Sequence, residues 1–255
     1  PPPHTTAPPA TAVATMDGFL TELMVYQGMS AEEARCVAKV YNATTVSTLS
    51  QLASLFTLHD AYFSSIPGPT EPNRMFALSG TSYGSASNDW VRLVEGFPQR
   101  SLFDDVLDAN KSYGVFSGDF PSALFLNSVR RHPSRIHDHS TFFSQLAAGD
   151  LPDFAWIEPR FFNVAGYPEQ DMHPHFDAVL SGTVSPGLHF LHTLYTAYAA
   201  SPVVNDTLFI VFFDEHGGFY DHVVPPSNNI PNPDGRFSSD PTFSFDRLRP
   251  PVPFV

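Results

Sequence analysis

The sequence predicts an α/β fold, in which a mainly parallel sheet is flanked by helices, and three observations lead to this class. Short apolar runs bounded by turn residues are typical of buried strands, and such runs occur at 114–117, 154–157 and 208–213. Segments with helical periodicity lie between these runs. Residues 187–200 form one such segment and lead into the third run, which makes the helix-then-strand half of a crossover unit.

Each predicted helix has a signal of its own. Ser30 and Glu33 have the spacing of a capping box, and they open a helix through residue 41 whose apolar residues fall on one face. Residues 49–56 continue with a second helical pattern. Ser101 and Asp104 repeat the capping-box spacing and open a third helix. We expect these helices and strands to form a single domain over residues 1–255.

The run LFIVFF at 208–213 is the strongest strand signal in the chain. An unbroken apolar run of this length is typical of a strand buried on both faces. We therefore expect an interior strand of the parallel sheet with Asp214 at its carboxyl end. Ligands of open parallel sheets bind beyond that end, so the residues after 213 are the first candidates for a functional site.

Composition narrows the possible functions. The chain has 255 residues with 13 Lys and Arg against 26 Asp and Glu, a net charge of −13. This charge excludes a surface that binds nucleic acid by attraction to its backbone. A single cysteine, Cys36, excludes an internal disulfide, and its helical surroundings predict a packing role. The composition does not determine the cellular compartment. Asn42 and Asn205 begin sequons that would be glycosylated in a secreted protein.

The first candidate site is the segment that follows LFIVFF. Asp214 and Glu215 are adjacent carboxylates, and His216 and two glycines come next. Crowded carboxylates need a cation to offset their charge, and oxygen and imidazole ligands suit a divalent metal ion. The alternative is a solvated loop, which the preceding apolar run disfavours.

The second candidate site is SIPGPTEPNR at 65–74. Here Thr70 is expected at the N-cap of a helix, where free backbone N–H groups favour an anion such as a phosphate. The Arg74 guanidinium would donate hydrogen bonds to two oxygens of the phosphate. An ordinary capped helix explains this segment equally well.

The third candidate site is DMHPHFD at 171–177, where His173 or His175 could contact a phosphoryl oxygen or a metal. Other histidines are expected at the surface. Those of the polar stretch at 129–139 should be solvated, and so should the two on the helix at 187–200 (His132, His137, His139, His189 and His192).

These motifs together resemble the phosphoesterase family that contains non-specific phospholipases C and certain acid phosphatases, relatives of the alkaline phosphatase fold. The matching segments follow the family's order: MDGF, SIPGPTEPNR, GDFPSALFL, LPDFAWIEPRFF, DMHP, DEHGGFYDHVVPP and FDRLRPPVP. The resemblance implies that Thr70 is the nucleophile and that Asp214 and Glu215 bind a divalent metal ion. It further implies that His173 contacts the phosphate, and it assigns substrate binding to Asn73, Arg74 and His4.

The resemblance also implies a fold that is truncated at both ends. The family's opening motif, Glu-Asn-Arg-Ser-Phe-Asp-His, is absent, and its closing Gly-x-Arg-Val-Pro has Arg249 and Pro251 in the Gly and Arg positions. The expected activity is phospholipase C action on glycerophospholipids through a phospho-threonine, with peripheral membrane contact. The alternatives are an acid phosphatase for small monoesters and, from another class, an inactive fragment or lipid-binding protein.

Overall fold

The computed structural model of the chain describes residues 16–164, 166–173, 184–238 and 243–255. The N-terminal part contains short helices followed by one longer helix: α1 (Gly18–Thr21), η1 (Glu22–Tyr26), α2 (Ala31–Ala34), η2 (Arg35–Ala38) and α3 (Ser47–Leu55). The next helices precede the sheet: α4 (Thr70–Ser79), α5 (Trp90–Glu95) and α6 (Leu102–Asp108). Strands and helices then alternate: β1 (Tyr113–Ser117), η3 (Ser122–Phe125), α7 (Asn127–Arg130), η4 (Pro133–Arg135), β2 (Ile136–Asp138), α8 (His139–Ala148), β3 (Phe154–Glu158) and α10 (Ser185–Ala199).

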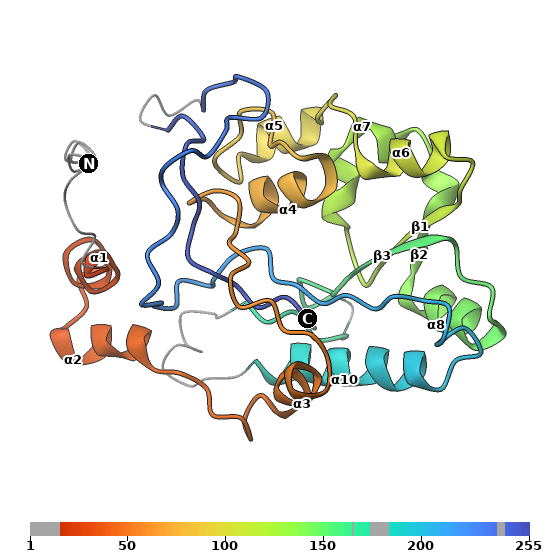
Figure 1. Cartoon of the computed structure of the whole chain (residues 1–255), viewed down its shortest axis with the longest axis horizontal. Helices are drawn as coiled ribbons and strands as arrows, with labels where there is room; N and C mark the ends of the chain where they lie inside the picture. The colour runs from red at the N-terminus through yellow and green to blue at the C-terminus, as the bar shows by residue number, and fades with distance from the viewer. Residues whose placement is uncertain (1–15, 165, 174–183, 239–242) are drawn as a thin grey trace.

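The described strands form one parallel sheet, in the order β2-β1-β3 (Figure 1). Val115 of β1 lies opposite Ile136 of β2 on one side and Trp156 of β3 on the other. Every residue of β1 is buried, as expected for a central strand. The predicted α/β class and the predicted strands at 114–117 and 154–157 are confirmed.

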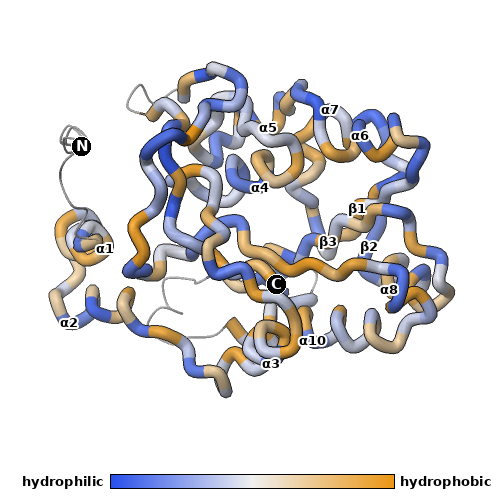
Figure 2. The backbone as a smooth tube through the Cα atoms, viewed as in Figure 1, coloured by the Kyte–Doolittle hydropathy of each residue, from blue (hydrophilic) through white to orange (hydrophobic). Residues whose placement is uncertain are grey.

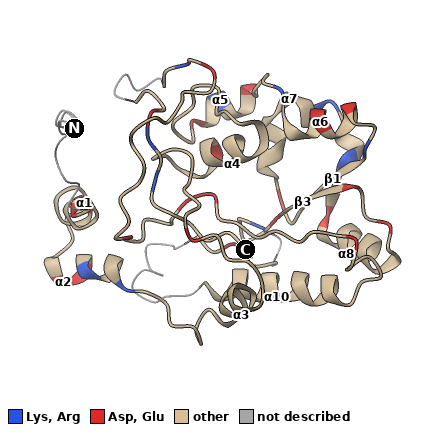
Figure 3. Cartoon of the chain, viewed as in Figure 1, with Lys and Arg blue, Asp and Glu red and all other residues tan. Residues whose placement is uncertain are grey.

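The sheet separates two layers of helices, because alternate residues of β1 point to opposite faces. Tyr113 and Val115 belong to a core that includes residues of α4, α5, α6 and α7, whereas Phe116 packs with Phe142 of α8 and Phe190 of α10. Figure 1 shows these helix groups on either side of the strands. Helix α10 carries no Lys, Arg, Asp or Glu (Figure 3), which suits a helix that packs along the apolar second core.

The local helix signals are confirmed. Ser30 and Ser101 each form the predicted capping box, with Glu33 and Asp104 respectively. Along α6, hydrophobic and hydrophilic residues both occur (Figure 2), and Phe103 is buried, as in a helix with one buried side. The first predicted helix ends at Ala38 rather than residue 41, because its second half is a 3₁₀ helix. Cys36 is buried, as predicted.

The prediction for residues 208–213 is wrong. Among the described residues this run is not a strand of the parallel sheet. Val211 instead exchanges two backbone hydrogen bonds of 2.8 Å with Val255, and Phe212 forms an antiparallel bridge with Phe254. Leu208 is 82% exposed and Ile210 is 48% exposed. Phe209 packs on Tyr195 and Tyr198 of α10, and Phe212 packs on Trp156 and Phe254, whereas these two aliphatic side chains face outward.

The polar stretch at 129–139 is also more structured than predicted. It contains β2, and His139 begins α8 in a partly buried position. The His139 ring stacks on Phe190 at 4.7 Å, and its Nε2 lies 2.7 Å from the Glu158 carbonyl oxygen. Burial lowers the pKa of His139. The expected exposure of His189 and His192 is confirmed. Within the described residues, the helices are too short or too polar to cross a bilayer.

Candidate active site

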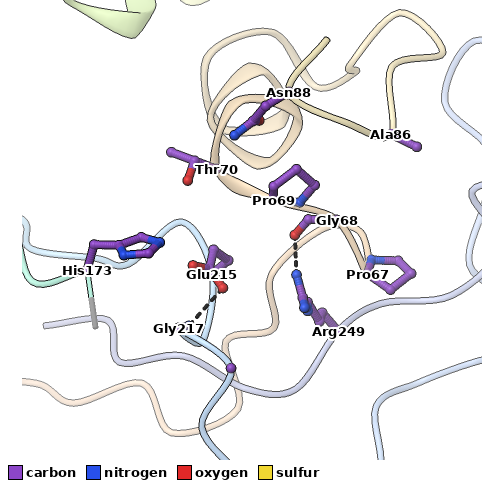
Figure 4. A pocket seen from close by; sticks show the side chains of 11 residues that line it. Pro67, Gly68, Pro69, Thr70, Ala86, Asn88, His173, Glu215, Gly217 and Arg249 are labelled. Carbon is purple, nitrogen blue, oxygen red and sulfur yellow. Dashed lines mark hydrogen bonds between the residues drawn. The ribbon is translucent and has the colours of Figure 1, made fainter. Parts of the chain in front are cut away.

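A pocket of about 440 Å³ brings together residues from five parts of the chain (Figure 4). One wall is the turn before α4 with the first residue of that helix, and a second is the loop before α5. The remaining walls come from the segment around 173, the loop after 213 and the C-terminal segment. The lining residues are Pro67, Gly68, Pro69, Thr70, Ala86, Asn88, His173, Glu215, Gly217, Gly218 and Arg249.

Thr70 is the first residue of α4, not its N-cap as predicted. Pro69 takes the cap position in an extended conformation and supplies no side-chain hydrogen bond. Asn88 of the loop before α5 compensates, because its Oδ1 accepts a hydrogen bond of 3.1 Å from the Glu71 N–H. The Thr70 hydroxyl therefore has no capping role. It makes no hydrogen bond with any described residue, and in Figure 4 it points toward His173 and Glu215.

Asn73 shapes the turn before α4 instead of lining the pocket. Its Oδ1 accepts a hydrogen bond of 3.0 Å from the Ile66 N–H, and its Nδ2 donates to the carbonyl oxygens of Gly68 and Pro69 at 3.1 Å each. The side chain is only 3% exposed. The structure thus places the residue predicted to bind substrate behind the pocket wall, where it fixes the backbone that carries Thr70.

Arg74 also lies behind the pocket, in a buried ion-pair network. Its Nε donates to Asp214 Oδ2 and its Nη1 to Glu158 Oε2, each at 2.9 Å. Burial alone would lower the pKa of this guanidinium, but the surrounding carboxylates raise it. Arg74 therefore stays charged, and its charge is balanced inside the protein. Arg74 does not line the pocket, and its predicted role in binding phosphate stays a prediction.

Glu71 is the third carboxylate beside Arg74, and it follows Thr70 directly. Its Oε1 accepts a hydrogen bond of 3.1 Å from the Ser122 hydroxyl, whereas its Oε2 is buried without a partner. Burial raises the pKa of Glu71 to about 7, against the opposing effect of Arg74. No pattern in the sequence singles out Glu71 for this buried position.

The loop after residue 213 carries Glu215 into the pocket and turns Asp214 away from it. Glu215 Oε2 accepts a hydrogen bond of 2.7 Å from the Gly217 N–H. Gly217 and Gly218 have φ of 66° and 80°, left-handed values that glycine adopts without strain. Burial and the neighbouring Asp214 raise the pKa of Glu215. Asp214 is absent from the pocket lining, since its carboxylate pairs with Arg74.

Arg249 lines the pocket next to the turn before α4, and His216, which is not part of the lining, contacts it. The Arg249 Nε donates a hydrogen bond of 3.0 Å to His216 Nε2, and its Nη1 donates to the Gly68 carbonyl oxygen. Burial, followed by the charge of Arg249, lowers the pKa of His216 to about 4. His216 is therefore neutral near pH 7.

His173 lines the pocket as the only residue of the predicted 171–177 segment that does so among those described. Its backbone N–H donates a hydrogen bond of 2.6 Å to Asp171 Oδ1. His175 lies outside the described residues, and so does His4. The structure thus brings Thr70, His173 and Glu215 to one pocket, with Asp214 behind it.

The donor atoms at this pocket are of the type that a hard divalent ion takes. Carboxylate oxygens are the ligands of Mg²⁺ and Ca²⁺, and the crowding that raises the pKa of Glu215 would be relieved by a cation. Within the described part of the chain, no three His, Cys, Asp or Glu side chains are grouped to hold an ion. Glu215 lines the pocket, whereas the Asp214 carboxylate pairs with Arg74, so the predicted binding of a metal ion by these two residues stays a prediction.

The fold and the pocket together define a class: an α/β protein whose pocket combines a hydroxyl, a carboxylate, an imidazole and a guanidinium. These groups are suited to act on a phosphate ester. The family model described as "Phosphoesterase family" matches residues 12–255. The chain belongs to this family.

Relatives with assigned names are similar over most of the chain. Non-specific phospholipase C6 of Arabidopsis thaliana is 37% identical over 247 residues, which cover 95% of this chain and 46% of that protein. Non-specific phospholipase C3 of the same plant is 36% identical over 243 residues, 93% of this chain and 45% of that protein. Phospholipase C B of Mycobacterium tuberculosis is 27% identical over 203 residues, 69% of this chain and 36% of that protein. The chain spans about half the length of the plant relatives.

Proposed function

We propose that this chain carries the catalytic residues of a phospholipase C that hydrolyses glycerophospholipids, and that residues 1–255 act as one domain. The observation that carries the proposal is the position of the Thr70 hydroxyl. It opens into a polar pocket with Glu215, His173 and Arg249, and it is not engaged by any described residue. The names of the relatives support the choice of phospholipid as substrate.

The proposed reaction proceeds in two steps through a phospho-threonine. Thr70 Oγ1 attacks phosphorus, its proton passes to water, and the bond between phosphorus and the glycerol oxygen breaks. His173, or a water molecule, protonates the departing diacylglycerol oxygen. Water then attacks the phospho-threonine, which releases the phosphorylated head group and restores the Thr70 hydroxyl.

The proposal includes a divalent metal ion, which Glu215 and Asp214 would hold. When bound, such an ion would lower the pKa of a hydroxyl that it contacts and would neutralise negative charge on the phosphoryl oxygens. The protein's own contribution is to fix the Thr70 backbone through Asn73 and to hold the Asp214 carboxylate through Arg74. The hydrogen bonds of Asn73 fix the turn before α4, and the buried ion pair with Arg74 fixes the Asp214 carboxylate.

An exposed apolar face next to the pocket supports a lipid substrate. Trp90, Val91 and Val94 of α5 are exposed, and Asn88, which lines the pocket, lies two residues before the helix. A tryptophan with aliphatic neighbours is suited to the interface of a bilayer. We propose that this face contacts the lipid surface while the head group enters the pocket.

The test compares Thr70→Ala with the unaltered chain on two substrates, phosphatidylcholine vesicles and a nitrophenyl phosphate ester. We expect Thr70→Ala to abolish release of phosphocholine while folding and metal content stay nearly unchanged. Thr57→Ala is the matched control, since Thr57 is exposed and lies outside the pocket. Mass spectrometry of quenched reactions should find a phosphocholine group from phosphatidylcholine, or a phosphoryl group from the nitrophenyl ester, on the Thr70 peptide of the unaltered chain alone.

The outcomes separate the competing functions. Hydrolysis of the nitrophenyl ester without hydrolysis of phosphatidylcholine would favour the acid phosphatase. Normal turnover by Thr70→Ala would show that the nucleophile is another hydroxyl. No turnover of either substrate by the unaltered chain, with divalent ions present, would favour a non-catalytic role.

A further inference from the structure

Two buried arginines lie close to the pocket, and their charges are balanced differently. Arg74 has two carboxylate partners, Glu158 and Asp214, at 2.9 Å each. Its guanidinium is therefore neutralised by the protein. A ligand that bound Arg74 would have to compete with both carboxylates.

Arg249 has no such partner. None of the ion pairs among the described residues includes it, although it lines the pocket and is largely buried. Its guanidinium contacts are to uncharged groups, the His216 ring and the Gly68 carbonyl oxygen. A buried charge without an ion-paired carboxylate is costly, and proteins ordinarily pair it. Burial lowers the pKa of Arg249, and the charge of Glu215, which makes no ion pair with it, opposes this effect only in part.

The backbone around Arg249 is held in place. Its own N–H donates to the Ser64 carbonyl oxygen at 3.0 Å, and the N–H groups of Leu248 and Val252 donate to Pro226 and Tyr62 at 2.9 and 2.8 Å. The two side-chain contacts then orient the guanidinium. They use one N–H of Nε and one of Nη1, and the other N–H groups make no hydrogen bond with a described residue.

We propose that Arg249 is the residue that binds the anionic oxygens of a phosphate in this pocket, in the role that the sequence assigned to Arg74. This inference rests on the proposed function and adds the residue that recognises the phosphate. The ligand class is a phosphate mono- or diester, because a planar guanidinium with adjacent free N–H groups matches two phosphate oxygens. Thr70 lies across the same pocket, so the bound phosphorus faces the hydroxyl.

The first experiment titrates the folded chain with inorganic phosphate by calorimetry, at constant ionic strength set with chloride. The variants are Arg249→Gln, Arg249→Lys and Arg100→Gln. The last is the matched control, since Arg100 is exposed and pairs with Asp105 and Asp108 on α6. We expect Arg249→Gln to weaken phosphate binding about tenfold or more, Arg249→Lys to weaken it less, and Arg100→Gln to leave it unchanged.

The second experiment needs no substitution and so does not depend on the folding of a variant. An arginine-selective dicarbonyl reagent is applied to the unaltered chain with and without phosphate, and modified peptides are quantified by mass spectrometry. We expect phosphate to protect Arg249 and not Arg100. A structural role for Arg249 would give no phosphate-dependent protection.

The results distinguish this inference from the function on which it rests. If the unaltered chain hydrolyses phosphate esters and Arg249→Gln binds phosphate as tightly as the unaltered chain does, the role of Arg249 alone is overturned. Absence of phosphate protection at Arg249 in an active chain does the same. A chain that neither binds phosphate nor hydrolyses an ester overturns both the inference and the proposed function.

Discussion

Replacing Glu71 with glutamine should change how the stability of the chain depends on pH. Glu71 is buried beside Arg74, its Oε2 has no partner, and burial raises its pKa from 4.5 to about 7. The folded chain therefore holds the Glu71 proton more tightly than the unfolded chain does. Its contribution to stability is fully present below pH 4.5 and is lost as pH rises through about 7.

The size of this effect follows from the two pKa values. A tenfold change in proton affinity corresponds to about 1.4 kcal/mol, so a pKa that moves from 4.5 to about 7 corresponds to about 3 kcal/mol. Glutamine resembles the protonated side chain and does not ionise. The free energy of unfolding of Glu71→Gln, minus that of the unaltered chain, should therefore rise by about 3 kcal/mol from pH 4.5 to above pH 7.

Urea denaturation measures this difference, with tryptophan fluorescence as the probe and a chelator in the buffer. Glu95→Gln is the control, because Glu95 is exposed at the end of α5. His216 also affects the pH profile, in the opposite direction: its pKa is lowered to about 4, so its contribution is lost as pH falls below about 6.5. That contribution is common to both chains and cancels. A difference that stays constant across this range would refute the buried, proton-binding state of Glu71.

Two further predictions test the ion-pair network and the corrected position of residues 208–213. Arg74→Met should lower the free energy of unfolding by about 3–5 kcal/mol, because it leaves the buried Glu158 carboxylate without its counter-charge. Arg100→Met should have little effect, and equal losses in the two urea titrations would contradict the network's importance. Leu208→Ala should cost less than about 0.5 kcal/mol, whereas Leu146→Ala, on the buried side of α8, should cost about 2–5 kcal/mol. A large loss at Leu208 would show that this side chain is buried after all.

Local signals predicted the parts of the fold that local interactions determine. A capping box depends on residues three positions apart, so Ser30 and Ser101 identified their helices from sequence alone. The strands at 113–117 and 154–158 could also be predicted from sequence, because a short apolar run between helical segments is usually a buried strand in an α/β protein. The run at 208–213 misled because apolar composition predicts an extended backbone but does not select its pairing partner.

The site was predicted in part for the same reason. Thr70 and Glu215 belong to recognisable motifs, and the structure places both in the pocket. Arg74 and Asn73 belong to a motif too, but polar residues in a motif can support the site from behind as readily as they can line it. Glu158 carried a signal that could have been used, since a carboxylate that ends a buried strand requires a buried cation. The sequence distinguishes Arg249 only as a departure from the closing motif, because its place in the pocket depends on contacts far along the chain.

The contacts that build the pocket also constrain the order in which it can form. Arg249 reaches Gly68 across a separation of 181 residues, and Arg74 reaches Asp214 across 140. Contacts of such long range close large loops, which slows folding and delays the structures that depend on them. During synthesis, β1, β2 and β3 can pair before residue 214 has been made, but the pocket cannot. The sheet is thus the early scaffold of this protein, and the pocket is assembled only when the C-terminal segment returns to the turn before α4.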